Sequence, residues 1–153
     1  KMKENSSEMI NAIIQKVGEK IEIGNIEEIE GNVLNNYVHN NKAAVIVALT
    51  KGSEDIAKDV AMHIAAMKPA YVRTEDIKEE DKIKVVEVFE KEVAQSDKSE
   101  EIKKKMLEGK IATYFKEQTL MDQMFIKDQN ISIEKLLSDN GAEFSSFIHV
   151  SII

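Results

Sequence analysis

The side chains with the widest chemical range in this sequence are its three histidines, because an imidazole can transfer protons and bind metals near neutral pH. His39, His63 and His149 show no His-Glu-x-x-His spacing, and the chain has no cysteine that could join them in a metal site. The pattern therefore predicts no metal site. His63 adjoins an apolar stripe and is expected to be packed, whereas His149 alternates with apolar residues and is expected to face solvent.

His39 lies in a polar segment, Asn35-Asn-Tyr-Val-His-Asn-Asn41, which is rich in turn-forming residues and contains one aromatic side chain. This pattern alone favours an ordinary hairpin tip with a solvated histidine. A role in binding is the alternative.

The segment Lys51-Gly-Ser53 superficially resembles a phosphate-binding loop, but the upstream glycine and the Gly-Lys-Ser/Thr order are both missing. Acidic pairs such as Glu27-Glu28 are adjacent in sequence and therefore point in different directions. No pair of nucleophile and base stands out. We therefore predict no bound cofactor, and the residues give little support for an enzyme.

The composition limits the possible partners. A formal net charge of −7 and a pI near 5.1 disfavour nucleic acid as a direct partner, since phosphate binding needs clustered positive charge. No apolar run approaches the roughly 20 residues of a membrane helix, and the charged start does not resemble a signal peptide. Together with the lack of cysteine, these features predict a soluble, cytoplasmic protein without a membrane partner. Because the chain begins with Lys1, we expect it to be a fragment.

Hydrophobic periodicity predicts the elements of the first half. Apolar residues recur at steps of three and four over residues 6–17, which predicts a helix that Gly18 ends. Alternation over residues 21–29 predicts a strand with a bend, and residues 43–49 read as a buried strand. Ser53 is expected to cap a following helix that Pro69 stops.

The second half is expected to contain a pair of antiparallel helices. Apolar residues cover an arc of about 200° between residues 83 and 93, which is wider than the ~100° stripe of a helix with one neighbour. Ser99 is expected to cap a second helix with its own stripe. The surplus apolar surface of the first helix predicts dimerisation through Ile83, Val86, Phe89 and Val93.

A short helix near residues 133–137, stopped by Gly141, and a strand over residues 148–152 complete the expected elements. The predicted fold class is α+β, with a small three-stranded antiparallel sheet packed with helices and a protruding antiparallel helical hairpin.

Several segments carry a resemblance to a known family. They are Val17-Gly-Glu-Lys-Ile21, Gly31-Asn-Val-Leu-Asn-Asn-Tyr-Val-His39, Ala61-Met-His-Ile-Ala-Ala66 with Pro69, and Glu108-Gly-Lys110 with Phe115, Glu117, Leu120 and Gln123. In this order and at this spacing they resemble bacterial elongation factor Ts, the nucleotide exchange factor for the GTPase elongation factor Tu. Met124, Lys110 and the strand around His149 depart from the family pattern.

The resemblance implies a domain organisation. Residues 1–30 correspond to a remnant of the N-terminal core subdomain, residues 31–75 and 124–153 to the C-terminal core subdomain, and residues 76–123 to an inserted dimerisation hairpin. The family's N-terminal helical domain and its Thr-Asp-Phe-Val loop have no counterpart in these residues.

The resemblance also implies the function. It predicts a protein that is not an enzyme, but binds elongation factor Tu and promotes GDP release, with exchange weakened in this fragment. The implied contact residues are Val17, Gly18, Tyr37, Val38, His39, Ile126 and Lys127, and core packing is the alternative role for Val17 and Ile126. The alternative function is a structural dimerisation or docking module without exchange activity.

Overall fold

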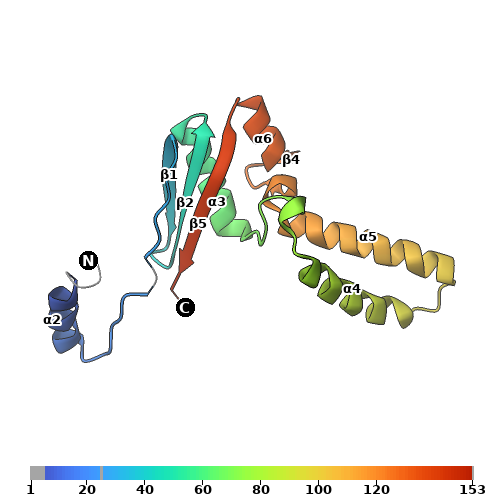
Figure 1. The fold of residues 1–153 in the computed structure, drawn as a ribbon, viewed down its shortest axis with the longest axis horizontal. Helices are drawn as coiled ribbons and strands as arrows, with labels where there is room; N and C mark the ends of the chain where they lie inside the picture. Colours follow the sequence, from blue (N-terminus) through green and yellow to red (C-terminus); the bar gives the residue numbers. More distant parts are fainter. Residues whose placement is uncertain (1–5, 25, 153) are drawn as a thin grey trace.

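A computed structural model of the chain describes residues 6–24 and 26–152, and it contains an antiparallel sheet with helices on one side (Figure 1). The strands are β1 (Val33–His39), β2 (Ala43–Lys51) and β5 (Glu143–Ser151), in the order β1-β2-β5. The predicted α+β class and three-stranded antiparallel sheet are confirmed.

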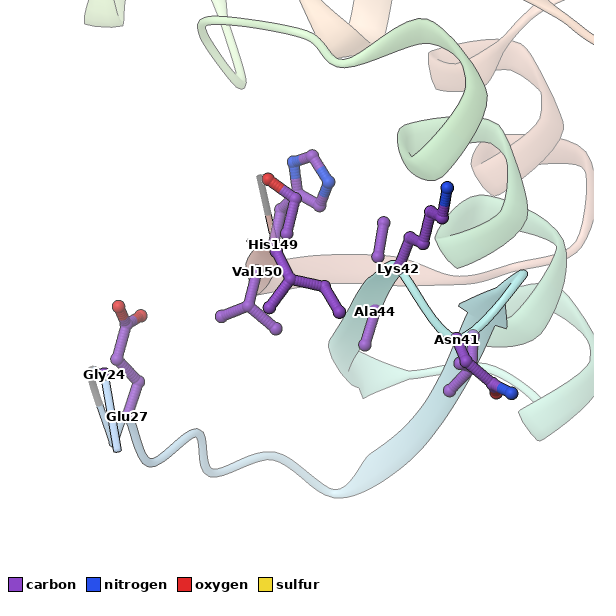
Figure 2. Close-up of a pocket in the computed structure, with 11 residues that line it drawn as sticks. Gly24, Glu27, Asn41, Lys42, Ala44, His149 and Val150 are labelled. Carbon is purple, nitrogen blue, oxygen red and sulfur yellow. The ribbon is translucent and has the colours of Figure 1, made fainter. Parts of the chain in front are cut away.

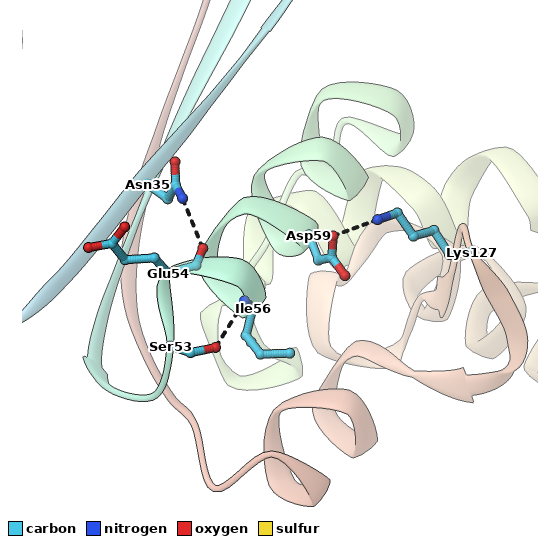
Figure 3. Close-up of polar contacts among 6 residues, drawn as sticks. All are labelled: Asn35, Ser53, Glu54, Ile56, Asp59 and Lys127. Atoms are coloured by element: carbon cyan, nitrogen blue, oxygen red, sulfur yellow. Dashed lines mark hydrogen bonds and ion pairs between the residues drawn. The ribbon is translucent and has the colours of Figure 1, made fainter.

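The first strand of the sheet is not the one that periodicity predicted. Within residues 18–24 and 26–32 no strand is present, so the prediction at 21–29 is wrong, and β1 is formed by the segment expected to be a loop. The strand was missed because its inward-facing positions are not all apolar. Asn35, a polar residue, occupies a position that faces the helix covering the sheet. Its amide is satisfied there by donating to the carbonyl of Glu54 at 2.9 Å (Figure 3).

Residues 40–42 connect β1 to β2 in a tight turn. Asn40 and Asn41 have φ of 50° and 55°, and the Lys42 N–H donates to the His39 carbonyl at 2.9 Å. Two successive residues with positive φ are typical of a type I′ turn, which matches the twist of paired strands. Asparagine tolerates this backbone region better than most residues.

Helix α3 (Glu54–Met67) covers one face of the sheet. It begins where predicted, because the Ser53 hydroxyl accepts a hydrogen bond from the Ile56 N–H at 3.3 Å (Figure 3). It ends at Lys68, whose φ is 47°, just before Pro69. Its apolar side is buried against β1 and β2.

The core lies between α3, the sheet and a small C-terminal unit. That unit consists of β3 (Met124–Phe125), β4 (Asp128–Ser132) and α6 (Ile133–Asp139), which ends at Asn140 with Gly141 following at φ 58°. The helix and its glycine stop are confirmed. The buried cluster contains Val45, Val47, Leu49, Ala57, Val60, Ala61, Ile64, Ala65, Leu120, Met121, Phe125, Ile133, Leu136, Leu137 and Ala142.

Strand β5 has the opposite phase from the one predicted. Val150 and Ile152 are 44% and 72% exposed, whereas His149 is half-buried. The register with β2 shifts around Ser145, so that Phe144 and Phe147 both pack against the core. Alternation continuing from Phe147 turns His149 towards the same side.

The predicted helical hairpin is confirmed as α4 (Glu79–Ala94) and α5 (Glu100–Gln118), which project from the core (Figure 1). Ser99 stands at the cap position of α5, but its side chain makes no capping hydrogen bond. Phe89 and Tyr114 pack edge to face, with ring centroids 5.8 Å apart.

Backbone hydrogen bonds at the base of the hairpin join it to the core. The N–H of Ala70 donates to Gln118, and that of Leu120 donates to Tyr71, both at 2.9 Å. The short 3₁₀ turns η1 (Thr74–Asp76) and η2 (Leu120–Asp122) flank this junction. Leu120 and Met121 are buried in the core, although the predicted hairpin boundary at residue 123 includes them.

Helix α2 (Ser7–Val17) stands apart from the sheet at the end of an extended connection (Figure 1). It ends as predicted at Gly18, whose φ is 75° and whose N–H donates to the Ile14 carbonyl at 2.8 Å. The apolar stripe of this helix is largely exposed, and Val17 is 56% exposed.

Candidate functional site

The candidate site begins at the turn end of β1, where His39 is held between two polar side chains. Its Nδ1 lies 3.1 Å from the Tyr37 hydroxyl oxygen, and its Nε2 lies 3.1 Å from the Asn40 amide nitrogen. The two rings are tilted by 39° with centroids 6.0 Å apart. His39 and Asn40 are exposed, so the imidazole is oriented and accessible at the same time.

Strand geometry explains why these groups meet. Tyr37 and His39 are two residues apart in β1, and residues at that spacing share a face of a strand. Tyr37 is half-buried and packs against the core, which fixes its ring. The exposed imidazole is therefore supported by a side chain anchored in the core. Val38 points to the opposite face and is 51% exposed.

His63 has a different environment. It is fully buried on α3, and its Nε2 lies 2.9 Å from the Gln123 side-chain oxygen, so Nε2 carries the hydrogen that is donated. Burial lowers the pKa of His63, and the hydrogen bond to Gln123 opposes that shift. The prediction of a packed histidine is confirmed.

Gln123 extends this contact to the helical hairpin. Its side-chain nitrogen donates to the Glu117 carbonyl at 2.7 Å, near the end of α5. The Phe125 ring packs beside His63, with centroids 6.2 Å apart. These contacts assign His63 to the structure of the core.

A hollow lies beside the turn end of the sheet (Figure 2). Lys42 lines it from the turn after β1, His149 and Val150 line it from β5, and Glu27 lines it from the segment before β1. The Nε2 of His149 is buried without a hydrogen-bond partner among the described residues. The prediction that this histidine faces solvent is therefore wrong.

Ile126 and Lys127 lie in the connection between β3 and β4. Ile126 is half-buried and packs against the core cluster. Lys127 donates from Nζ to an Asp59 carboxylate oxygen at 2.6 Å, which ties this connection to α3 (Figure 3). Sequence reasoning missed Asp59, which is 68 residues away from its partner.

The predicted contact residues fall into three groups that come from different elements. Val17 and Gly18 stand at the end of α2, with nothing within 4 Å of a Cβ built at Gly18. Among the interactions of the described residues, none joins either this group or the Lys127 connection to His39. Tyr37 and His39 are thus the predicted residues that the structure brings into direct contact.

The predicted dimerisation residues differ in accessibility. Ile83 is 52% exposed, Val86 and Phe89 are half-buried, and Val93 is only 5% exposed. Val93 therefore belongs to the interior of the hairpin. Val88, which was not predicted, is 62% exposed.

Two absences concern the part of the chain that the structure describes. No helix there is long and apolar enough to cross a membrane. No group of three or more histidine and acidic side chains is arranged there to hold a metal ion.

The sheet covered by α3, with a helical hairpin inserted between its strands, defines an α+β core with a projecting arm. The family model described as Elongation factor TS matches residues 1–152. The chain therefore belongs to the elongation factor Ts family of translation elongation factors.

Curated relatives support this membership. Elongation factors Ts of Francisella tularensis subsp. novicida and subsp. tularensis are each 38% identical to the chain over 141 residues, which is 92% of this chain and 49% of theirs. That of Cellvibrio japonicus is 39% identical over 142 residues, again 92% of this chain and 49% of the relative. The chain thus spans about half the length of these relatives.

Proposed function

We propose that this chain binds elongation factor Tu and promotes release of GDP from it. Membership of the elongation factor Ts family supports this proposal. The observation that carries it is the exposed His39 imidazole, which Tyr37 and Asn40 hold in place at the end of β1. Such an arrangement can press a fixed polar group onto a partner without any covalent chemistry.

The mechanism follows from linkage between two binding equilibria. Suppose that the chain binds the nucleotide-free GTPase more tightly than the nucleotide-bound GTPase. Bound chain must then lower the affinity of the GTPase for nucleotide, and bound nucleotide must lower the affinity of the GTPase for the chain by the same factor. His39 with Tyr37 and Val38 would supply one part of the contact. Val17 and Gly18 would supply a second part, and Ile126 and Lys127 a third. The exposure of Val17 supports its role in a contact over its role in a core.

We further propose that these 153 residues accelerate release less than a full-length relative does. The sequence contains no Asp-Phe pair of the kind that the resemblance places beside the nucleotide site. The chain would then dock on elongation factor Tu and cause part of the distortion of the GTPase's nucleotide site. Full-length rates with these residues alone would contradict this proposal.

The test is release of a fluorescent GDP analogue from elongation factor Tu, together with a direct binding assay. His39→Ala should slow release and weaken binding, and Thr113→Ala, at an exposed position on α5, should change neither. If the chain fails to bind the GTPase, the proposed function is wrong. If His39→Ala matches the unmodified chain in both assays, the role of His39 is wrong.

We also propose that the hairpin pairs two copies of the chain, because Ile83 and Val88 expose apolar surface on α4. Ile83→Lys should then lower the mass measured by sedimentation velocity, while Glu87→Lys, a matched change at an exposed position of the same helix, should not. A monomeric unmodified chain at high micromolar concentration would contradict this pairing. The family match favours the exchange-factor proposal over a module that only dimerises.

A further inference from the structure

We propose that Asn40 is a positioning residue that, together with Tyr37, fixes His39 in one tautomer and one ring orientation. The functional use of this arrangement rests on the proposed binding of elongation factor Tu. The arrangement itself rests on the contacts of the two ring nitrogens, each with a polar partner at 3.1 Å.

The chemistry of the donors determines the tautomer. The Asn40 side-chain nitrogen can only donate, so the His39 Nε2 that it contacts must accept. A neutral imidazole then carries its hydrogen on Nδ1. That hydrogen is directed to the Tyr37 hydroxyl oxygen. The three side chains therefore form a short directed chain of hydrogen bonds, in which Asn40 donates to His39 and His39 donates to Tyr37.

The turn explains why Asn40 can reach back to the ring. Asn40 is the first of the two turn residues with positive φ, and it directly follows His39 at the end of β1. Asn41 has nearly the same backbone conformation, with φ of 55° against 50°. The described hydrogen bonds of the His39 ring involve Asn40 and Tyr37, not Asn41. The turn thus supplies its own matched control.

Immobilising the His39 ring before the partner binds should raise affinity by an amount that can be estimated. An exposed side chain loses rotational freedom when it is immobilised at an interface, and a group that is already fixed avoids most of that loss. Loss of the Asn40 contact should therefore weaken partner binding by about threefold to tenfold. Loss of the Asn41 side chain should leave binding unchanged.

The experiment compares Asn40→Gly with Asn41→Gly in the 153-residue chain. Glycine adopts positive φ without strain, so both variants keep the turn and differ in which amide is removed. Histidine labelled with ¹⁵N is observed by long-range proton–nitrogen correlation at about pH 8.5, two units above the ordinary histidine pKa. His39→Gln identifies the His39 signals.

We expect the unmodified chain and Asn41→Gly to show His39 mainly with its hydrogen on Nδ1. Asn40→Gly should shift the signals towards a mixture of both tautomers. A change that is equal in the two variants would overturn the proposal. So would an unmodified His39 that carries its hydrogen mainly on Nε2.

Binding to elongation factor Tu, measured on the same variants, separates this inference from the proposed function. If the tautomer shifts in Asn40→Gly while His39→Ala still binds normally, Asn40 positions the ring and the proposed role of His39 is wrong. If His39→Ala loses binding while Asn40→Gly keeps both its tautomer and its affinity, the proposed role of His39 stands and positioning by Asn40 is wrong.

Discussion

Replacing Gln123 with alanine should destabilise the junction between α3 and the base of the helical hairpin. Gln123 is 4% exposed and uses both ends of its amide. Its oxygen accepts from the buried His63 Nε2–H at 2.9 Å, and its nitrogen donates to the Glu117 carbonyl at 2.7 Å. The substitution therefore removes the partner of a fully buried donor and a second hydrogen bond at once.

The expected cost follows from these two contacts. A buried donor left without its partner costs about 1–3 kcal/mol, and the second hydrogen bond contributes about 1 kcal/mol. We therefore expect the free energy of unfolding to fall by roughly 2–4 kcal/mol. For a chain of this size, each kcal/mol shifts Tm by about 2–4 °C, so Tm should fall by about 4–16 °C.

The assay is denaturant-induced unfolding followed by circular dichroism, supported by a thermal scan. Gln129→Ala, at an exposed position of β4, is the matched control and should leave the unfolding free energy within about 0.5 kcal/mol of the unmodified chain. If Gln123→Ala changes stability no more than this control does, the amide does not hold His63 as argued. The junction would then depend on apolar packing alone.

Below pH 7 the unfolding free energy should fall as pH decreases, by at most about 1.4 kcal/mol per unit, because burial lowers the pKa of His63 and the unfolded chain then binds more protons. His63→Gln should flatten this slope between about pH 7 and 5 in denaturant titrations. Gly31→Ala should destabilise the fold by about 1–3 kcal/mol, since the new Cβ would lie 2.8 Å from a Cβ on β2. Gly109→Ala, in open space within α5, should stabilise the fold by about 0.5–1 kcal/mol. If Gly31→Ala and Gly109→Ala changed the free energy of unfolding equally in chemical denaturation, both expectations would be contradicted. Asp59→Asn should change stability by less than about 1 kcal/mol, because its ion pair is partly exposed, and should strengthen the proposed binding to elongation factor Tu by freeing Lys127. Weaker binding in a titration would show that the pair acts as a unit.

Helices such as α2 and α3 could be predicted from sequence because they carry a periodic apolar stripe. Strand β1 could not be predicted from apolar periodicity, since a polar Asn35 takes a position facing α3 and is satisfied there by the Glu54 carbonyl. The prediction of which β5 side chains face the core was wrong, because a register shift around Ser145 cannot be seen in the pattern of apolar residues. Local signals thus identified the helices, whereas tertiary contacts determined where β1 forms and which side chains are buried.

The candidate site shows the same division. The place of His39 came from resemblance, and its contact with Asn40 could have been found from the turn chemistry of two adjacent asparagines between strands. The contact between His63 and Gln123 spans 60 residues, and no periodicity reports on it. Sequence reasoning therefore reached the residues of the site, but not the distant partners that hold the surrounding core.

The geometry of β1 restricts how a partner can use the proposed contact residues. Tyr37 and His39 share one face of the strand, while Val38 points to the other. A partner that touches both Val38 and His39 cannot lie flat on either face of the sheet. It must approach the open edge of β1 or its end, where β1 turns into β2. At that end Asn40 holds the His39 ring, so we expect Asn40, and not only the histidine, to influence affinity.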